Sequence, residues 1–115
     1  MNQQPALFQR RWQAETRLMH NTFPEFRPFV REGLLTDDIG FEGQLKGKSG
    51  SIYTVHIGAR VSGYPVSVPK IYIQPMVGPN RYPDGSLCVN RPWRPRQDTF
   101  AQQVLYAAHY LQQHG

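Results

Sequence analysis

The chain has 115 residues, which is enough for one domain and too few for two. Its 39% hydrophobic content can build a core and argues against overall disorder, while 10 glycines and 10 prolines argue against a simple helical bundle. The net charge of +5 is carried mostly by arginine, which suits phosphate or carboxylate partners, and no apolar run is long enough for a membrane helix.

Cysteine usage narrows the chemistry further. Cys88 is the only cysteine, which excludes an internal disulfide framework and a cysteine-based zinc site. A lone thiol fits a reducing compartment, and the N-terminal residues lack the apolar stretch of a secretory signal. We therefore expect a cytoplasmic protein with no metal, no other cofactor and no membrane partner.

The first expected element is a helix over residues 5–21. Pro5 suits the first turn of a helix, where its missing N–H costs nothing. The apolar residues within one arc of this helix are Leu7, Phe8, Trp12, Ala14, Leu18 and Met19. Arg11 and Glu15 interrupt that arc, and Phe23-Pro24 and Pro28 end the helix.

The middle of the chain has the pattern of strands. Residues 52–59 alternate in the period-2 manner of a half-buried strand, and shorter candidates span 41–45 and 69–75. Turns rich in glycine and serine separate them, as in an antiparallel meander of three or four strands. Without repeats or linkers, residues 1–115 form a single expected domain.

Prolines make regular structure improbable between residues 77 and 97, and a long loop in a small domain usually carries function. A second helix is expected over residues 99–113, where Thr99 and Gln102 form a capping-box pattern. The predicted fold class is therefore α+β: an N-terminal helix, an antiparallel meander, a long loop and a C-terminal helix.

Cys88 lies within the long loop, just after the turn signal Asp84-Gly85. A single cysteine is more often a small core residue than a nucleophile. Four arginines close to it in sequence would favour its thiolate form; they are Arg81, Arg91, Arg94 and Arg96. No histidine has the local spacing of a Cys/His pair.

The order of these features resembles the ubiquitin-conjugating enzyme family. The matching segments are Tyr64-Pro65 with Pro69, Gly78-Pro79-Asn80, Gly85-Ser86-Leu87-Cys88, Trp93-Arg94-Pro95 and the helix from residue 99. In that family an Asn precedes the catalytic Cys by eight residues and a Gly precedes it by three, as Asn80 and Gly85 do here. The resemblance spans residues 5–113 and implies a ubiquitin-conjugating-enzyme-like fold.

The chain also departs from the family pattern. Gly78 stands where the family has a loop-organising histidine, Asn90 stands where many members have aspartate, and the last two family helices are absent. Such short forms are similar to prokaryotic conjugating-enzyme-like proteins that accompany an activating enzyme and a ubiquitin-like protein, with antiviral defence as one setting. The departures leave thioester loading better supported than transfer to lysine.

The resemblance implies an acyltransferase that accepts a ubiquitin-like modifier from an activating enzyme as a Cys88 thioester and passes it to an amine. Asn80 would donate to the oxyanion or stiffen the loop; its alternative is an Asx-type bond to its own backbone. The expected loop-supporting residues are Pro79, Asp84, Gly85, Asn90 and Trp93. Arg10, Arg11 and Arg17 would face the activating enzyme or form a solvated basic face.

Two other functions compete with this interpretation. One is a non-catalytic module on the same fold that binds a ubiquitin-like protein or another partner. The other is a basic nucleic-acid-binding domain, which is disfavoured because no recognised binding motif accompanies the charge. The sequence does not identify the modifier, the acceptor, the pathway, any need for a ligase, or the oligomeric state.

Overall fold

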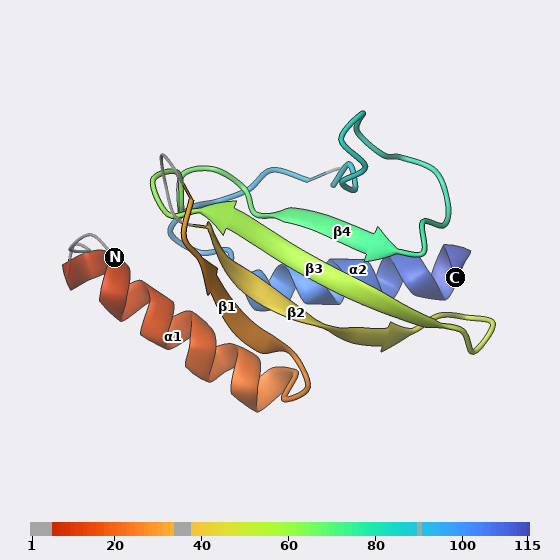
Figure 1. Ribbon diagram of the computed structural model, residues 1–115, viewed down its shortest axis with the longest axis horizontal. Helices are drawn as coiled ribbons and strands as arrows, with labels where there is room; N and C mark the ends of the chain where they lie inside the picture. The colour runs from red at the N-terminus through yellow and green to blue at the C-terminus, as the bar shows by residue number, and fades with distance from the viewer. Residues whose placement is uncertain (1–5, 34–37, 90) are drawn as a thin grey trace.

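The structure is a computed structural model that describes residues 6–33, 38–89 and 91–115. A four-stranded antiparallel sheet is ordered as a simple meander, β1-β2-β3-β4, and two helices complete the fold (Figure 1). The elements are α1 (Ala6–Thr22), β1 (Arg27–Arg31), β2 (Asp38–Lys46), β3 (Ile52–Arg60), β4 (Lys70–Gln74) and α2 (Phe100–His114). The expected α+β class and the antiparallel sheet are confirmed.

Both helices pack on one face of the sheet and build the core there. Residues Val55, Ile57, Ile71 and Ile73 alternate inward along β3 and β4 and are at most 1% exposed. Trp12 of α1 lies between the sheet and α2: its ring centroid is 5.0 Å from that of Phe41 and 5.7 Å from that of Phe100. This aromatic contact is where α1, the sheet and α2 meet.

The C-terminal helix begins where its local sequence predicts. Thr99 is the N-cap, its side chain accepts from the Gln102 N–H at 3.2 Å, and the Gln102 side chain accepts from the Thr99 N–H at 2.8 Å. This reciprocal capping box satisfies two backbone donors at the helix start. The prediction of a helix over 99–113 is therefore confirmed, with the helix itself shifted by one residue.

Strand β1 has no counterpart among the strands expected from the sequence, and β2 begins three residues earlier than expected. In the sequence Pro28 suggests the end of a helix, but it lies in an edge strand, where only one side of the backbone must pair. Arg27, Phe29 and Arg31 of β1 face the same side as Glu42, Gly40 and Asp38 of β2, their cross-strand partners. This side of the sheet is the outer face.

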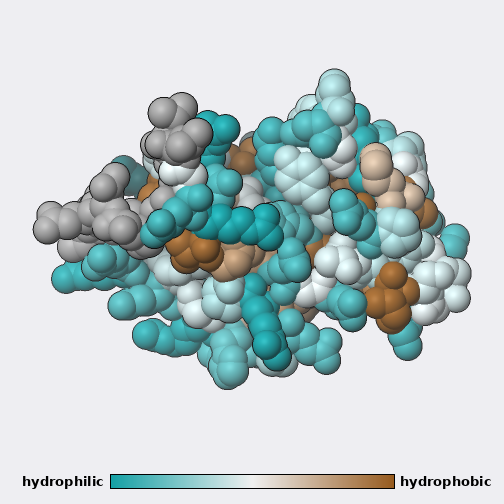
Figure 2. Space-filling view, viewed as in Figure 1, coloured by the Kyte–Doolittle hydropathy of each residue, from teal (hydrophilic) through white to brown (hydrophobic). Residues whose placement is uncertain are grey.

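The outer face is covered by neither helix. Figure 1 shows α2 behind the sheet, and Figure 2, in the same view, shows the opposite side, on which hydrophilic side chains predominate. In the described part of the chain, neither helix combines the length and apolarity needed to span a bilayer.

Gly40 is buried in β2 beneath the Phe29 ring, and we expect its replacement by alanine to destabilise the domain. A Cβ at Gly40 would collide with the carbonyl oxygen of Ile57 and come within 2.7 Å of the Phe29 ring. Forcing atoms into filled space costs about 1–3 kcal/mol. Urea denaturation should show this loss for Gly40→Ala and a smaller one for Gly63→Ala, whose new methyl would meet mainly the movable Ser67 side chain. Equal losses in the two variants would contradict the steric explanation.

Candidate active site

The loop between β4 and α2 carries the candidate site. Within it, a bridge between Arg81 and Leu87 closes a tight turn, in which the Tyr82 N–H donates to Ser86 O at 2.8 Å. The Leu87 N–H donates to Ile71 O at 2.9 Å, which ties the turn to β4. The described residues of the loop contain no helix or strand, as expected from its prolines. Asn90, expected to support the loop, lies outside the described residues.

This turn brings the backbones of the two predicted catalytic residues together. The Cys88 N–H donates to the Asn80 carbonyl at 2.7 Å. The Cys88 side chain is only partly buried, so its sulfur is not sealed in the core. Asn80 is exposed and has a φ of 66°, in the left-handed region that Asn tolerates better than most residues. Within the described ranges its side-chain amide has no hydrogen-bond partner.

Tyr82 is a site residue that the sequence reasoning missed. Its side chain is 52% exposed and lies close enough to Cys88 for the two side chains to interact. Interaction with the Cys88 side chain raises the pKa of Tyr82. The phenol therefore stays protonated and can donate toward the sulfur. The available signal was the Asp84-Gly85 turn, which pairs residue 82 with residue 86 and residue 80 with residue 88.

Asp84 and Gly85 shape the turn. One carboxylate oxygen of Asp84 accepts from the Ser86 N–H at 2.9 Å and the Ser86 hydroxyl at 2.6 Å, which is an Asx-type bond. The other accepts from Lys70 Nζ at 2.7 Å, and these bonds, that of Lys70 first, hold the pKa of Asp84 well below its ordinary value. Gly85 has a φ of 90°, which a residue with a side chain rarely adopts. The Asx-type bond considered for Asn80 thus falls on Asp84.

Three of the four arginines near Cys88 in sequence bind other groups, which weakens one argument for an activated thiolate, whereas Arg96 is exposed. Arg81 donates to Val77 O at 2.7 Å and to Gly85 O at 3.1 Å. Arg91 and Arg94 pair with Asp98 at 2.9 and 3.4 Å. Asp98 is 1% exposed, so it must be balanced by neighbouring donors. Position in sequence did not reveal Asp98 as the partner of these arginines.

The charge on Asp98 makes the stability of this segment depend on pH. Burial opposes ionisation, but the Arg94 N–H at 2.6 Å and the charges of Arg91 and Arg94 outweigh it and hold the pKa of Asp98 below its ordinary value. A carboxyl whose pKa is lowered by folding stabilises the fold fully above its unfolded pKa and loses that contribution as pH falls. We expect Asp98→Asn to be less stable than wild type at pH 7, and the difference to shrink below about pH 4. Urea denaturation at several pH values tests this, and a constant difference would contradict it.

Contacts with α2 explain why position 78 is a glycine. Its φ is 76°, and a Cβ at this position would collide with the Tyr110 hydroxyl and lie 2.8 Å from the His114 Cβ. The Tyr110 hydroxyl lies 2.8 Å from Val77 O and 2.5 Å from Pro79 O and can donate to either. The end of α2 therefore fixes the backbone on both sides of Gly78, just before Asn80.

Trp93 and a neighbouring groove flank the turn. Trp93 is half-buried, packs against the core and donates from Nε1 to Pro65 O at 2.7 Å. Beside it a groove of about 650 Å³ borders the turn. Its apolar lining residues are Val68, Pro69, Pro83, Leu87, Val89 and Trp93. Leu87 and Val89, the chain neighbours of Cys88, line this groove, which offers space for an extended acyl chain.

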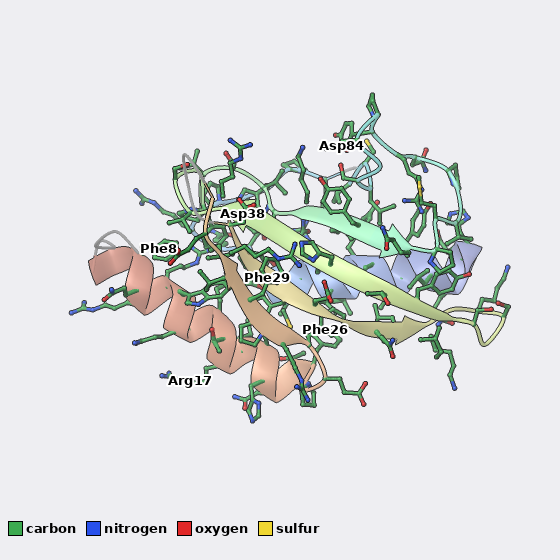
Figure 3. The ribbon with its side chains drawn as sticks, viewed as in Figure 1. Phe8, Arg17, Phe26, Phe29, Asp38 and Asp84 are labelled. Atoms are coloured by element: carbon green, nitrogen blue, oxygen red, sulfur yellow. The ribbon has the colours of Figure 1, made fainter. Side chains whose placement is uncertain are left out.

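The three arginines of α1 do not share one environment. Arg10 and Arg17 are exposed (Figure 3 labels Arg17), whereas Arg11 is turned into the structure. Its guanidinium donates to Pro95 O at 2.6 Å and Asp98 O at 2.7 Å, and it also lies 3.5 Å from Glu15. Arg11 thus holds α1 against the segment before α2, which leaves Arg10 and Arg17 as the exposed candidates for a partner surface.

Glu15 completes this internal network. It is 2% exposed and accepts from the Tyr64 hydroxyl and, at 3.0 Å, from the Phe100 N–H at the start of α2. Burial raises the pKa of Glu15, against the opposing effect of its hydrogen bonds, and burial beside Glu15 also raises the pKa of Tyr64. Glu15, which interrupts the apolar arc of α1, therefore joins α1 to α2 and to the loop after β3.

Within the described ranges, no three His, Cys, Asp or Glu side chains are grouped as metal ligands. Comparison with known proteins adds no assignment: no protein-family model matches the chain, and neither a curated protein nor a solved structure matches it significantly.

Proposed function

We propose that this chain is a cysteine acyltransferase of the ubiquitin-conjugating kind. It would accept the C-terminal glycine of a ubiquitin-like modifier from an activating enzyme on Cys88 and pass it to an amine. The observation that supports the proposal is the 2.7 Å backbone bond from the Cys88 N–H to the Asn80 carbonyl, which joins a partly buried cysteine to an exposed asparagine.

The chemistry follows from these groups. The Cys88 thiolate attacks the carbonyl carbon of the incoming thioester, and the carbonyl oxygen becomes an oxyanion. As that oxyanion collapses, the thiolate of the activating enzyme leaves and a new thioester to Cys88 remains. An amine then attacks the same carbon, Cys88 leaves as thiolate, and the amine proton passes to solvent. Asn80 would donate to the oxyanion in both steps.

Tyr82 and the groove beside Trp93 support the same function. The phenol of Tyr82 lies near Cys88 and would donate to the sulfur when Cys88 departs as a thiolate. The groove borders the turn that ends at Cys88 and would receive the extended tail of the modifier. On this proposal the fold is a short ubiquitin-conjugating-enzyme-like fold of the prokaryotic type, acting in the cytoplasm, with the activating enzyme and the modifier as its partners.

The proposal is tested with a peptide ending in Gly-Gly that carries a C-terminal mercaptoethanesulfonate thioester. Intact-protein mass spectrometry should detect one acyl group on wild type, removable by added thiol and absent from Cys88→Ala. The matched control is Cys88→Ala combined with Leu105→Cys, which places a thiol at a position 62% exposed on α2. Acylation of Cys88 no faster than that of the thiol introduced on α2 would overturn the proposal, because the site would give no advantage over any exposed thiol.

The second candidate is a non-catalytic binding module on the same fold. The observation favouring it is that Arg81, Arg91 and Arg94 are held by other groups and do not surround the thiol. A module of this kind would bind the modifier equally well with Cys88 or with alanine and would form no adduct with either the peptide thioester or a loaded activating enzyme.

A further inference from the structure

The outer face of the sheet contains a hollow that is distinct from the groove beside Trp93. The two cavities adjoin, and Val68 and Lys70 line both. It has a volume of about 580 Å³, within the range of small-ligand pockets. It lies where β1 and β3 end and β2 and β4 begin, and the loop after β3 forms one wall through Ser62, Gly63 and Ser67. Figure 3 labels two of its lining residues, Phe29 and Asp38.

The floor of the hollow is bare backbone. Gly40 and Gly58 are cross-strand partners in the centre of the sheet. A Cβ at Gly58 would project toward the hollow, 3.2 Å from His56 Nε2 and 3.5 Å from the Phe29 ring. The hollow therefore has room at this level because Gly58, which lines it, carries no side chain.

Side chains of both charges line the hollow, and they alternate in sign across three neighbouring strands. Arg31, Asp38 and Arg60 are consecutive cross-strand partners on β1, β2 and β3, so one carboxylate lies between two guanidinium groups. No ion pair within 4.0 Å joins these three among the described residues. Lys70 lines the hollow from β4 but is already paired with Asp84 at 2.7 Å. Two arginines and one carboxylate are thus available to a ligand.

Aromatic rings form the remaining wall. The Phe29 and His56 rings are stacked, with centroids 4.5 Å apart and planes at 22°, and Tyr72 meets His56 edge-on at 6.2 Å. The Glu42 carboxylate lies 3.0 Å from His56 Nδ1, within hydrogen-bond distance, on the side of the ring away from Gly58. The Arg31 guanidinium lies 5.0 Å from the Phe29 ring, so the cationic and aromatic parts of the lining adjoin.

We propose that this hollow binds a ribonucleotide, with its phosphates on Arg31 and Arg60 and its base against Phe29 and His56. Guanidinium groups match phosphate oxygens with paired donors, and aromatic side chains stack on bases. Ser62 and Ser67 add hydroxyl donors. The proposal is independent of the chemistry at Cys88.

Asp38 distinguishes this ligand from other phosphate-bearing ones. A carboxylate between two arginines repels a bare inorganic phosphate, but it is the group that accepts hydrogen bonds from ribose hydroxyls in nucleotide sites. A free nucleotide therefore has a counterpart for each of its parts within the hollow, whereas a nucleic-acid strand would also use the exposed cations beyond it, Arg27 and Lys46.

The test is isothermal titration of the full chain with ATP, without divalent metal, beside adenosine, pyrophosphate and a ten-residue oligo(dT). We expect saturable ATP binding, and binding of adenosine and of pyrophosphate at least tenfold weaker. Arg31→Ala combined with Arg60→Ala should weaken ATP binding at least tenfold. The matched control is Arg27→Ala with Lys46→Ala, which removes the same charge from the same face beyond the hollow.

Three results would overturn the proposal. They are no saturable binding of ATP, an equal loss of affinity in the Arg27/Lys46 control, and binding of oligo(dT) tighter than that of ATP. The last would identify the face as a nucleic-acid surface. Thermal melting of each variant verifies folding, and acylation of Cys88 by the peptide thioester should continue in the Arg31/Arg60 variant, which separates this inference from the proposed transferase activity.

Discussion

Glu15→Ala should be among the most destabilising single substitutions in this domain. The change leaves the Tyr64 hydroxyl and the Phe100 N–H without their acceptor and removes the anion beside Arg11. An unsatisfied buried donor costs about 1–3 kcal/mol, and two are created here, so we expect a loss of about 3 kcal/mol in the free energy of unfolding. For a domain of this size such a loss lowers the melting temperature by roughly 10 °C or more. Urea denaturation and thermal melting measure it.

Two further variants make this result specific. Glu15→Gln keeps one acceptor oxygen for either Tyr64 or Phe100 and should lose less stability than Glu15→Ala. Glu25→Ala removes a carboxylate of the same kind from an exposed position and should have a small effect. If Glu15→Ala melts at the same temperature as Glu25→Ala, the network does not join the two helices as described.

This network also explains where sequence-based prediction fails. The partners of Glu15 are 49 and 85 residues away, so no local pattern could show that a glutamate in the apolar arc of α1 is satisfied. The capping box at Thr99 was predictable because both of its bonds span three residues. Strand β1 was missed because a five-residue edge strand containing Pro28 has few local signals, and its pairing with β2 supplies the rest.

The same distinction holds at the candidate site. The approach of residue 80 to residue 88 follows from the turn at Asp84-Gly85, which the spacing in the sequence indicates. Asp98 lies only seven residues from Arg91 and four from Arg94, but its burial, which makes it their partner, depends on tertiary packing. The contact of Gly78 with Tyr110 is non-local, since it joins the loop to the far end of α2.

Asn80→Gly should lower the rate of Cys88 acylation by about 10²–10³, the loss expected when one oxyanion donor is removed. Glycine is the informative replacement, because the φ of 66° at this position would strain alanine, and glycine removes the amide without that strain. The Asn80 carbonyl that accepts from the Cys88 N–H belongs to the backbone and is retained. The rate is measured with the Gly-Gly peptide thioester by intact-protein mass spectrometry.

Asn80→Asp tests whether the amide acts as a donor, because it keeps the size of the side chain and replaces the donor with a negative charge. That charge would face the developing oxyanion, so Asn80→Asp should acylate no faster than Asn80→Gly. Both variants should melt close to wild type, since the exposed Asn80 side chain has no partner among the described residues. An Asn80→Gly variant that acylates at the wild-type rate would remove the amide from the chemistry and leave Cys88 and Tyr82 as the only reactive groups proposed for this site.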